Sequence, residues 1–154
     1  MATVRITGLP APLSLPANPT RQVADSYPGW PCRRCLCDAT VGDVMLLVFY
    51  DPWLVDSPYR QSGPVFVHEQ NCQPWQGLGL PEQQTRRILS LRAIDHAGLQ
   101  RIGDVVPGAA ALDRLDHVLA DPDIAYVHLH HAGPGCFAAR VDRITKRCTQ
   151  LLSK

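Results

Sequence analysis

The two segments IAYVHLHH (124–131) and CFAARVDR (136–143) decide the fold. Apolar and polar side chains alternate along both, which is the period of a β-strand, and Gly133-Pro134-Gly135 between them suits a tight turn. The pattern therefore predicts an antiparallel hairpin whose apolar side chains share one face. The register that achieves this makes three pairs: His130 with Cys136, His128 with Ala138, and Tyr126 with Arg140.

The predicted hairpin gathers polar side chains on its other face, where His128, His130, Cys136 and Arg140 lie together. A His-x-His on a strand points both rings the same way, which suits a metal or an acid/base pair. Cys136 opposite His130 would be a thiol beside a base, and Arg140 offers a fork for a carboxylate or a phosphate. The plainer alternative is a solvent-facing strand surface with ordinary polar residues.

Outward from the hairpin, the chain predicts further strands with helices between them. Strands are expected at residues 3–7, 44–50, 64–68 and 101–106, the second as a central strand covered on both faces and the last at a sheet edge. Helices are expected from residue 81 to about residue 92, and over residues 109–120. This order predicts an α+β fold with a mainly antiparallel sheet, two helices and long Pro/Gly-rich loops.

Length and composition predict one globular domain over residues 1–154. Within it, residues 8–31 hold six of the 14 prolines and are expected to form an irregular wrap over the surface. Residues 144–154 are expected to form a C-terminal tail. The formal net charge of +1 gives no electrostatic case for nucleic-acid binding, and no apolar run is long enough to span a membrane.

The N-terminal residues show no pattern of a secretory signal, so a cytoplasmic location is expected. In that compartment the six cysteines are expected to be reduced, metal-bound or catalytic rather than paired as structural disulfides.

The stretch CRRCLC (32–37) places three thiols within six residues. Cys32 and Cys35 form a C-x2-C pair, and His68 and Cys72 form a second pair farther along the chain. Two such pairs supply the four ligands of a closed tetrahedral zinc site, and the two arginines inside the first pair would offset the charge of bound thiolates. The alternative is free thiols in a loop. A thioredoxin-type redox pair would need a helix that begins at Cys32, whereas here the pair is followed by residues 36–43 and then by the strand expected at 44–50.

Short motifs along the chain carry a resemblance to a known family: ITGLP (6–10), PGWPCR (28–33), the 42–50 strand, SPYR (57–60), PVFVH (64–68), YVH (126–128) and GCFAARVDR (135–143). Together they resemble a bacterial family known only as domain of unknown function 1203. The resemblance implies a shared fold and a shared pocket, but no reaction. It covers Cys32, Arg33 and the His128/Cys136/Arg140 strand pair. Members often carry Ser in place of Cys35.

These observations favour a small cytosolic protein that binds zinc through Cys32, Cys35, His68 and Cys72 and holds a small anionic molecule beside the hairpin cluster. One alternative is a metal-independent enzyme with Cys136 or Cys32 as nucleophile, His130 or His128 as base, and Arg33 or Arg140 as anion anchor. A second alternative is a non-catalytic module that binds a partner. The partner expected under the first two hypotheses is a small molecule, with neither nucleic acid nor membrane involved.

Overall fold

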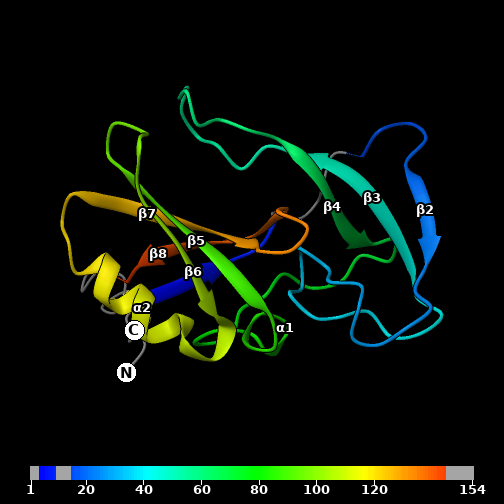
Figure 1. Cartoon of the computed structure of the whole chain (residues 1–154). Helices are drawn as coiled ribbons and strands as arrows, with labels where there is room; N and C mark the ends of the chain where they lie inside the picture. Colours follow the sequence, from blue (N-terminus) through cyan, green and yellow to red (C-terminus); the bar gives the residue numbers. More distant parts are fainter. Residues whose placement is uncertain (1–3, 10–14, 145–154) are drawn as a thin grey trace, which may run out of the picture.

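The computed structural model describes residues 4–9 and 15–144 and contains two antiparallel sheets (Figure 1). The five-stranded sheet has the order β1-β8-β7-β5-β6, formed by Val4–Thr7, Phe137–Arg143, Ile124–His131, Ile88–Asp95 and Gln100–Pro107. The three-stranded sheet has the order β2-β3-β4, formed by Thr20–Val23, Val44–Tyr50 and Gly63–His68. The helices are α1 (Glu82–Thr85) and α2 (Gly108–Leu119). The α+β class with mostly antiparallel sheet is therefore confirmed.

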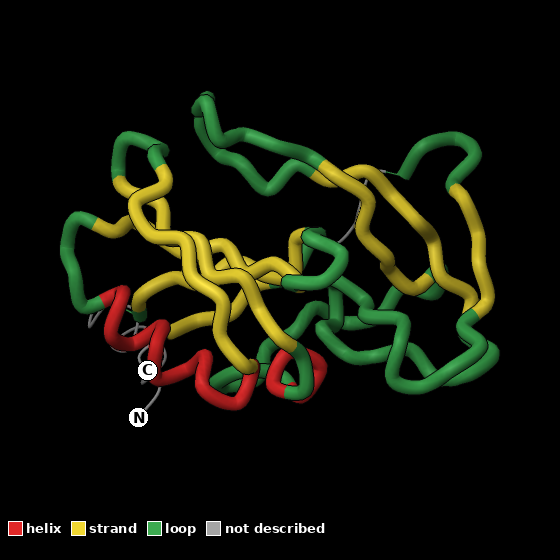
Figure 2. The backbone as a smooth tube through the Cα atoms, in the orientation of Figure 1, coloured by secondary structure: helices red, strands yellow, loops and turns green. Residues whose placement is uncertain are grey.

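Both helices lie on the same side of the five-stranded sheet, and the three-stranded sheet stands beside it (Figure 2). The apolar stripe of α2 packs against this sheet, where Leu115 meets buried residues such as Leu91 and Leu129. A second core forms under the three-stranded sheet and includes Cys32 and Phe137. Because Phe137 begins β8 of the other sheet, this second core joins the two sheets.

The expected helix over residues 81–92 is wrong beyond its first turn. Pro81 and Glu82 do begin a helix, but α1 ends at Thr85 and β5 starts at Ile88. Along β5, alternate residues such as Leu89 and Leu91 are fully buried, and the strand pairs with β6 on one side and β7 on the other. Tertiary pairing thus overrides a local helix-start signal, since the central place in a sheet needs an extended chain.

The expected irregular wrap over residues 8–31 also differs from the structure. It contains β2, which pairs with β3 as an exposed edge strand. Residues 10–14 of the wrap and residues 145–154 of the expected tail lie outside the described residues. The other expected elements are present: β1, β3 in the centre of its sheet, β4, β6 at a sheet edge, and α2.

The hairpin of β7 and β8 is present, but its predicted register is wrong. His128 pairs with Arg140 rather than Ala138, and a bulge between Leu129 and His130 places Phe137, not Cys136, opposite His130. The prediction assumed that the hairpin has one apolar, buried face and one solvent-exposed face. Here both faces are covered, since β7 is buried almost throughout, so alternation did not fix the pairing.

Neither helix of the described residues has the length and hydropathy needed to cross a membrane.

Candidate metal centre and adjoining cavity

The candidate metal centre is built on a tight loop between β2 and β3, which we call the knuckle (residues 31–38). Its ends are held together by a bridge between Pro31 and Asp38, and the N–H of Cys32 donates to the carbonyl of Cys37 at 3.0 Å. Leu36 adopts a φ of 56°, a conformation that costs a residue with a Cβ. Its buried side chain in the core of the five-stranded sheet keeps it there.

Neighbouring segments clamp the knuckle from outside. The amide of the buried Gln83 on α1 donates to the carbonyls of Cys32 (3.1 Å) and Cys37 (2.9 Å). After β1, Gly8 passes so close that a Cβ there would lie 2.1 Å from the carbonyl oxygen of Arg33. Glycine is therefore required at position 8 for the chain to rest against the knuckle.

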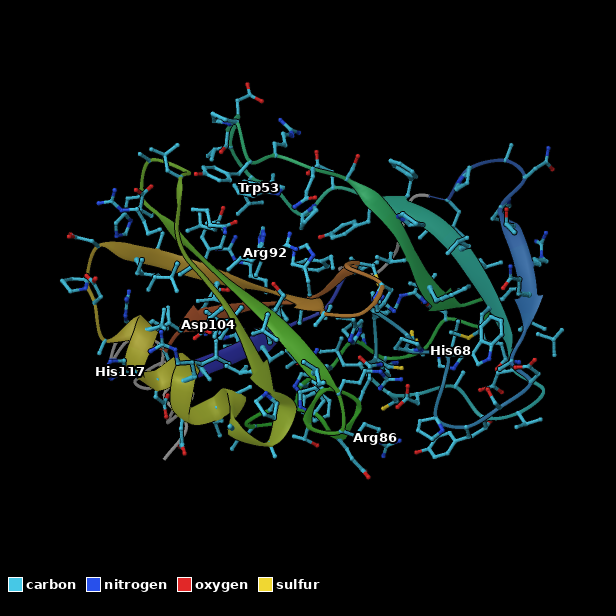
Figure 3. The ribbon with its side chains drawn as sticks, viewed as in Figure 1. Trp53, His68, Arg86, Arg92, Asp104 and His117 are labelled. Carbon is cyan, nitrogen blue, oxygen red and sulfur yellow. The ribbon has the colours of Figure 1, made fainter. Side chains whose placement is uncertain are left out.

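The second half of the centre comes from β4 and the loop after it. The N–H of Arg33 donates to the carbonyl of Phe66 at 2.9 Å, which lays the knuckle alongside β4. His68 ends β4, and the N–H of Cys72 bonds back to Gln70 at 2.8 Å in a tight turn. These contacts turn His68 and Cys72 toward the knuckle, and sulfur atoms gather beside His68 in Figure 3.

The four residues that the sequence singles out as metal ligands are brought together. The ligand atoms of Cys32, Cys35, His68 and Cys72 all lie within 4.8 Å of one another. The Sγ atoms of Cys32 and Cys72 are 3.6 Å apart, and Cys35 Sγ is 3.7 Å from His68 Nδ1. In a tetrahedral zinc site these separations are about 3.8 Å for two sulfurs and about 3.6 Å for sulfur and nitrogen. This Cys3His cluster could therefore hold a metal ion.

The pKa values of the thiols of the cluster are shifted in opposite directions. Hydrogen bonds from the sulfurs of Cys35 and Cys72 hold the pKa of Cys32 far below its usual range, although burial opposes this. The same bonds to Cys32, together with burial, raise the pKa values of Cys35 and Cys72. These shifts favour the thiolate form at Cys32 over that at Cys35 or Cys72. A divalent cation would take the place of the remaining protons.

His68 is oriented by a carboxylate behind it. Its Nε2 lies 3.2 Å from Oδ2 of Asp43, while its Nδ1 faces Cys35. The pKa of His68 is raised chiefly by its hydrogen bond with Cys32 and also by Asp43. A ligand imidazole commonly donates its second N–H to a carboxylate, which fixes the ring and its tautomer. Arg34 approaches the cluster from another side, with Nη1 3.9 Å from Cys72 Sγ.

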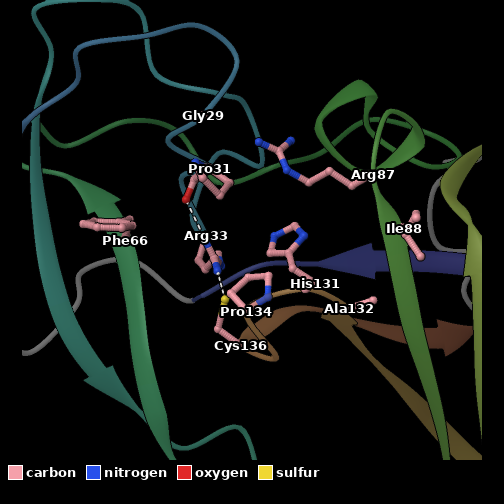
Figure 4. A pocket seen from close by; sticks show the side chains of 11 residues that line it. Gly29, Pro31, Arg33, Phe66, Arg87, Ile88, His131, Ala132, Pro134 and Cys136 are labelled. Atoms are coloured by element: carbon pink, nitrogen blue, oxygen red, sulfur yellow. Dashed lines mark hydrogen bonds between the residues drawn. The ribbon is translucent and has the colours of Figure 1, made fainter.

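A cavity of about 460 Å³ lies on the other side of the knuckle (Figure 4). Its polar lining consists of Arg33, Arg87, His131 and Cys136, and apolar walls are formed by residues such as Phe66. The Nη2 of Arg33 donates to Cys136 Sγ at 2.7 Å, shown as a dashed line in Figure 4. Arg33 thus stands in the knuckle between two cysteines of the metal cluster and projects its guanidinium toward this cavity.

The expected hairpin cluster is divided by the structure. Only Arg33 and Cys136 of the predicted catalytic set line the cavity. His128 and His130 are buried, with ring centroids 6.4 Å apart, and Arg140 lies over the Tyr126 ring at 4.0 Å and pairs with Asp142. The hairpin face is therefore not the solvent-facing surface of the plainer alternative.

The two buried histidines are neutral at physiological pH. Burial lowers the pKa of His128 to about 3 and that of His130 to about 4, helped for His128 by the charge of Arg140. His130 Nδ1 lies 2.9 Å from the carbonyl of Gly135, so it carries the proton and donates. His130 is thus held by its hydrogen bond to the turn between β7 and β8, and Phe137 rather than Cys136 lies opposite it.

A family model described as "Protein of unknown function (DUF1203)" matches residues 29–143. The chain belongs to the DUF1203 family. The match confirms the resemblance that the sequence motifs suggested, and it includes the metal cluster and the four polar residues of the cavity. No curated protein and no solved structure matches this DUF1203 chain.

Four residues of the DUF1203 site were not anticipated: Asp43, Gln83, Arg87 and His131. His131 was passed over because strand alternation puts it on the face opposite His128 and His130. That face turns out to border the cavity. Asp43, Gln83 and Arg87 carry no motif, and only the folded chain brings Asp43 to His68 and the other two to the knuckle.

Proposed function

We propose that this DUF1203 protein binds one zinc ion through Cys32, Cys35, His68 and Cys72. The observation that supports this most strongly is the agreement of the Sγ–Sγ and Sγ–Nδ1 separations, 3.6 and 3.7 Å, with tetrahedral coordination. Three thiolates and an imidazole are soft to borderline ligands, which favour zinc over magnesium, calcium or manganese.

The proposed role of the ion is structural. Four protein ligands fill a tetrahedral shell and leave no position for a substrate. Cys32 is fully buried, and the ion would tie the knuckle to the end of β4 and to the loop that follows. Three thiolates exceed the charge of the ion by one, and Arg34, 3.9 Å from Cys72 Sγ, lies where it offsets that excess.

The second part of the proposal is a binding pocket for a small anionic molecule in the cavity beside the knuckle. Its volume of about 460 Å³ is suited to a small ligand, and two guanidinium groups line it. The cytosol is the proposed setting, because thiol ligands and the free Cys136 need reducing conditions to persist.

Metal analysis of the purified protein tests the zinc site. After reduction and reconstitution with zinc, we expect one zinc per chain in the wild type and loss of most of it in Cys35→Ser, which removes one ligand. Cys37→Ser is the matched control, since Cys37 is exposed, only two residues away, and outside the cluster. Retention of zinc by Cys35→Ser, or equal loss in both variants, would overturn the proposal.

A further inference from the structure

Arg33 is a buried cation whose hydrogen-bond partners are not carboxylates. Arg33 is only 1% exposed to solvent. It donates three hydrogen bonds, each of 2.7 Å, to the carbonyls of Phe137 and Pro31 and to Cys136 Sγ. A guanidinium has five N–H donors, so two are left for a further acceptor. A buried charge is costly unless an anion accompanies it, and this one faces a cavity.

The carboxylate of Asp38 is not available to Arg33 because it pairs with other arginines. Arg87, which lines the same cavity, is paired with Asp38 through Nη2–Oδ1 at 2.6 Å and Nη1–Oδ2 at 3.0 Å. Asp38 is also shared with Arg86 at 3.2 Å. One carboxylate therefore serves two arginines, and the cavity keeps an excess of positive charge beside Arg33.

His131 is a second buried polar residue that lines the cavity. It is only 3% exposed, yet neither ring nitrogen has a hydrogen-bond partner among the described residues. Its ring lies in the cavity with Arg33 and Arg87 around it (Figure 4). Burial, then the charges of Arg33 and Arg87, lower its pKa to about 3, so the ring is neutral. A neutral imidazole offers one donor and one acceptor, and buried polar groups of this kind normally have a partner.

We propose that this cavity binds a small carboxylate-bearing molecule, whose carboxylate pairs with Arg33 and bonds His131, and that Sγ of Cys136 is the nucleophile facing it. This rests on the anion pocket proposed above, but not on the zinc site. The guanidinium fork matches the planar carboxylate, and a single unpaired cation suits a monoanion better than a phosphate group. Apolar walls such as Phe66 and Pro134 would cover the body of the molecule.

The reactivity can be measured with a carboxylate reagent, iodoacetate, against its neutral analogue, iodoacetamide. In either reaction Cys136 Sγ forms a bond to the methylene carbon, the C–I bond breaks, and iodide leaves with the electron pair. The thiol proton goes to solvent. Since the two reagents deliver the same carbon centre, the ratio of their rates at one cysteine reports whether the site selects a carboxylate.

Cys37 provides an internal reference because it is an exposed cysteine of the same chain outside the cavity. On reduced, zinc-loaded protein, the rates at Cys136 and Cys37 are followed by tandem mass spectrometry. We expect the iodoacetate-to-iodoacetamide ratio at Cys136 to exceed that at Cys37 by about tenfold or more. Excess acetate should slow the iodoacetate reaction at Cys136 only. Equal ratios at the two cysteines, or no protection by acetate, would overturn the proposal.

Two variants assign the selectivity to residues. Arg33→Lys keeps the charge but removes the fork, and His131→Leu removes both ring nitrogens; each should lower the ratio at Cys136 toward that at Cys37. Arg86→Lys is the control, since Arg86 also bonds Asp38 but lies outside this cavity. If Arg33→Lys fails to fold, His131→Leu decides, and an unchanged ratio in that variant would count against the site. Zinc content, measured on the same samples, separates this result from the fate of the metal proposal.

Discussion

His128 is a titratable side chain enclosed by rings. It is 1% exposed, with the rings of Trp53 and Phe137 at 5.3 and 5.4 Å from its own, and neither of its nitrogens has a hydrogen-bond partner among the described residues. Burial holds its pKa at about 3. The unfolded chain, where histidine has its ordinary pKa near 6.5, therefore takes up a proton as the pH falls, while the native state does not.

The free energy of unfolding should therefore fall as the pH falls. The stability that the neutral ring allows is complete above about pH 6.5 and is lost as the pH falls toward 3. We predict that wild-type protein loses about 2 kcal/mol more than His128→Phe in free energy of unfolding between pH 7 and pH 5, because the variant has no proton to take up there. Urea unfolding at the two pH values measures this.

His117→Phe, at an exposed position on α2, controls for the loss of one histidine and should show the wild-type dependence. An identical pH dependence in His128→Phe and the wild type would contradict the buried-histidine argument.

At the scale of single residues, spacing predicted well which four side chains form the Cys3His cluster, but it predicted the lining of the cavity poorly. Cys32, Cys35, His68 and Cys72 were recognisable because ligation demands particular residue types at short intervals. The sequence left two roles open for Arg33, one offsetting the charge of bound thiolates and one anchoring an anion, and did not decide between them. The direction of the Arg33 side chain depends on the carbonyl of Phe137, a residue 104 positions later in the chain.

At the scale of elements, α2 ends in a set of contacts from the last described strand. Arg143 on β8 donates to the carbonyl of Leu119 from Nε (2.8 Å) and Nη2 (2.6 Å), and Nη2 also lies near the carbonyls of Asp121 (3.0 Å) and Ile124 (3.1 Å). The final carbonyls of a helix have no partner within it, and a cation there also complements the helix dipole.

We predict that Arg143→Met lowers the free energy of unfolding by about 1–3 kcal/mol, because the carbonyl of Leu119 at the end of α2 and those of Asp121 and Ile124 lose this donor. The measurement is urea unfolding at neutral pH. Arg114→Met is the matched control: Arg114 lies on α2 and makes a partly exposed ion pair with Asp104, which should cost less than about 1 kcal/mol. Equal losses in the two variants would rule out a special role for Arg143.

The elements themselves were predictable where local and tertiary preferences agree. The stripe of leucines over residues 109–120 suits both a helix and the sheet beneath it, so α2 appears as expected. At residues 88–95 the two preferences conflict. Pro81 and Glu82 begin a helix, but the buried alternation from Leu89 onward is satisfied only by strand neighbours distant in sequence.

At the scale of the whole molecule, the two sheets depend on the metal cluster unequally. The ligands come from the knuckle, the end of β4 and the loop after it, all beside the three-stranded sheet. The five-stranded sheet has its own core with α2, in which Leu36 is the contribution of the knuckle. Removal of the ion should therefore loosen one part of the molecule before the other.

We predict that chelation of zinc raises amide hydrogen exchange by about tenfold or more in residues 31–38 and β4, while β5 and β7 change by less than about threefold. Hydrogen exchange with mass spectrometry on holo and chelator-treated protein measures this. Zinc added back should restore protection, which controls for chelator effects. A uniform rise over both sheets would show instead that the metal supports the molecule as one cooperative unit.

The position of Arg33 has one further consequence. Its backbone belongs to the knuckle and pairs with β4, while its guanidinium lines the cavity. Two binding equilibria that share a residue in this way are thermodynamically linked, and the linkage is reciprocal. If the ion changes the affinity of the cavity for a carboxylate by some factor, the carboxylate changes the affinity of the cluster for the ion by the same factor. If the ion tightens the binding of the carboxylate, a cell short of zinc would retain the ion longest in those copies of the protein whose cavity is filled.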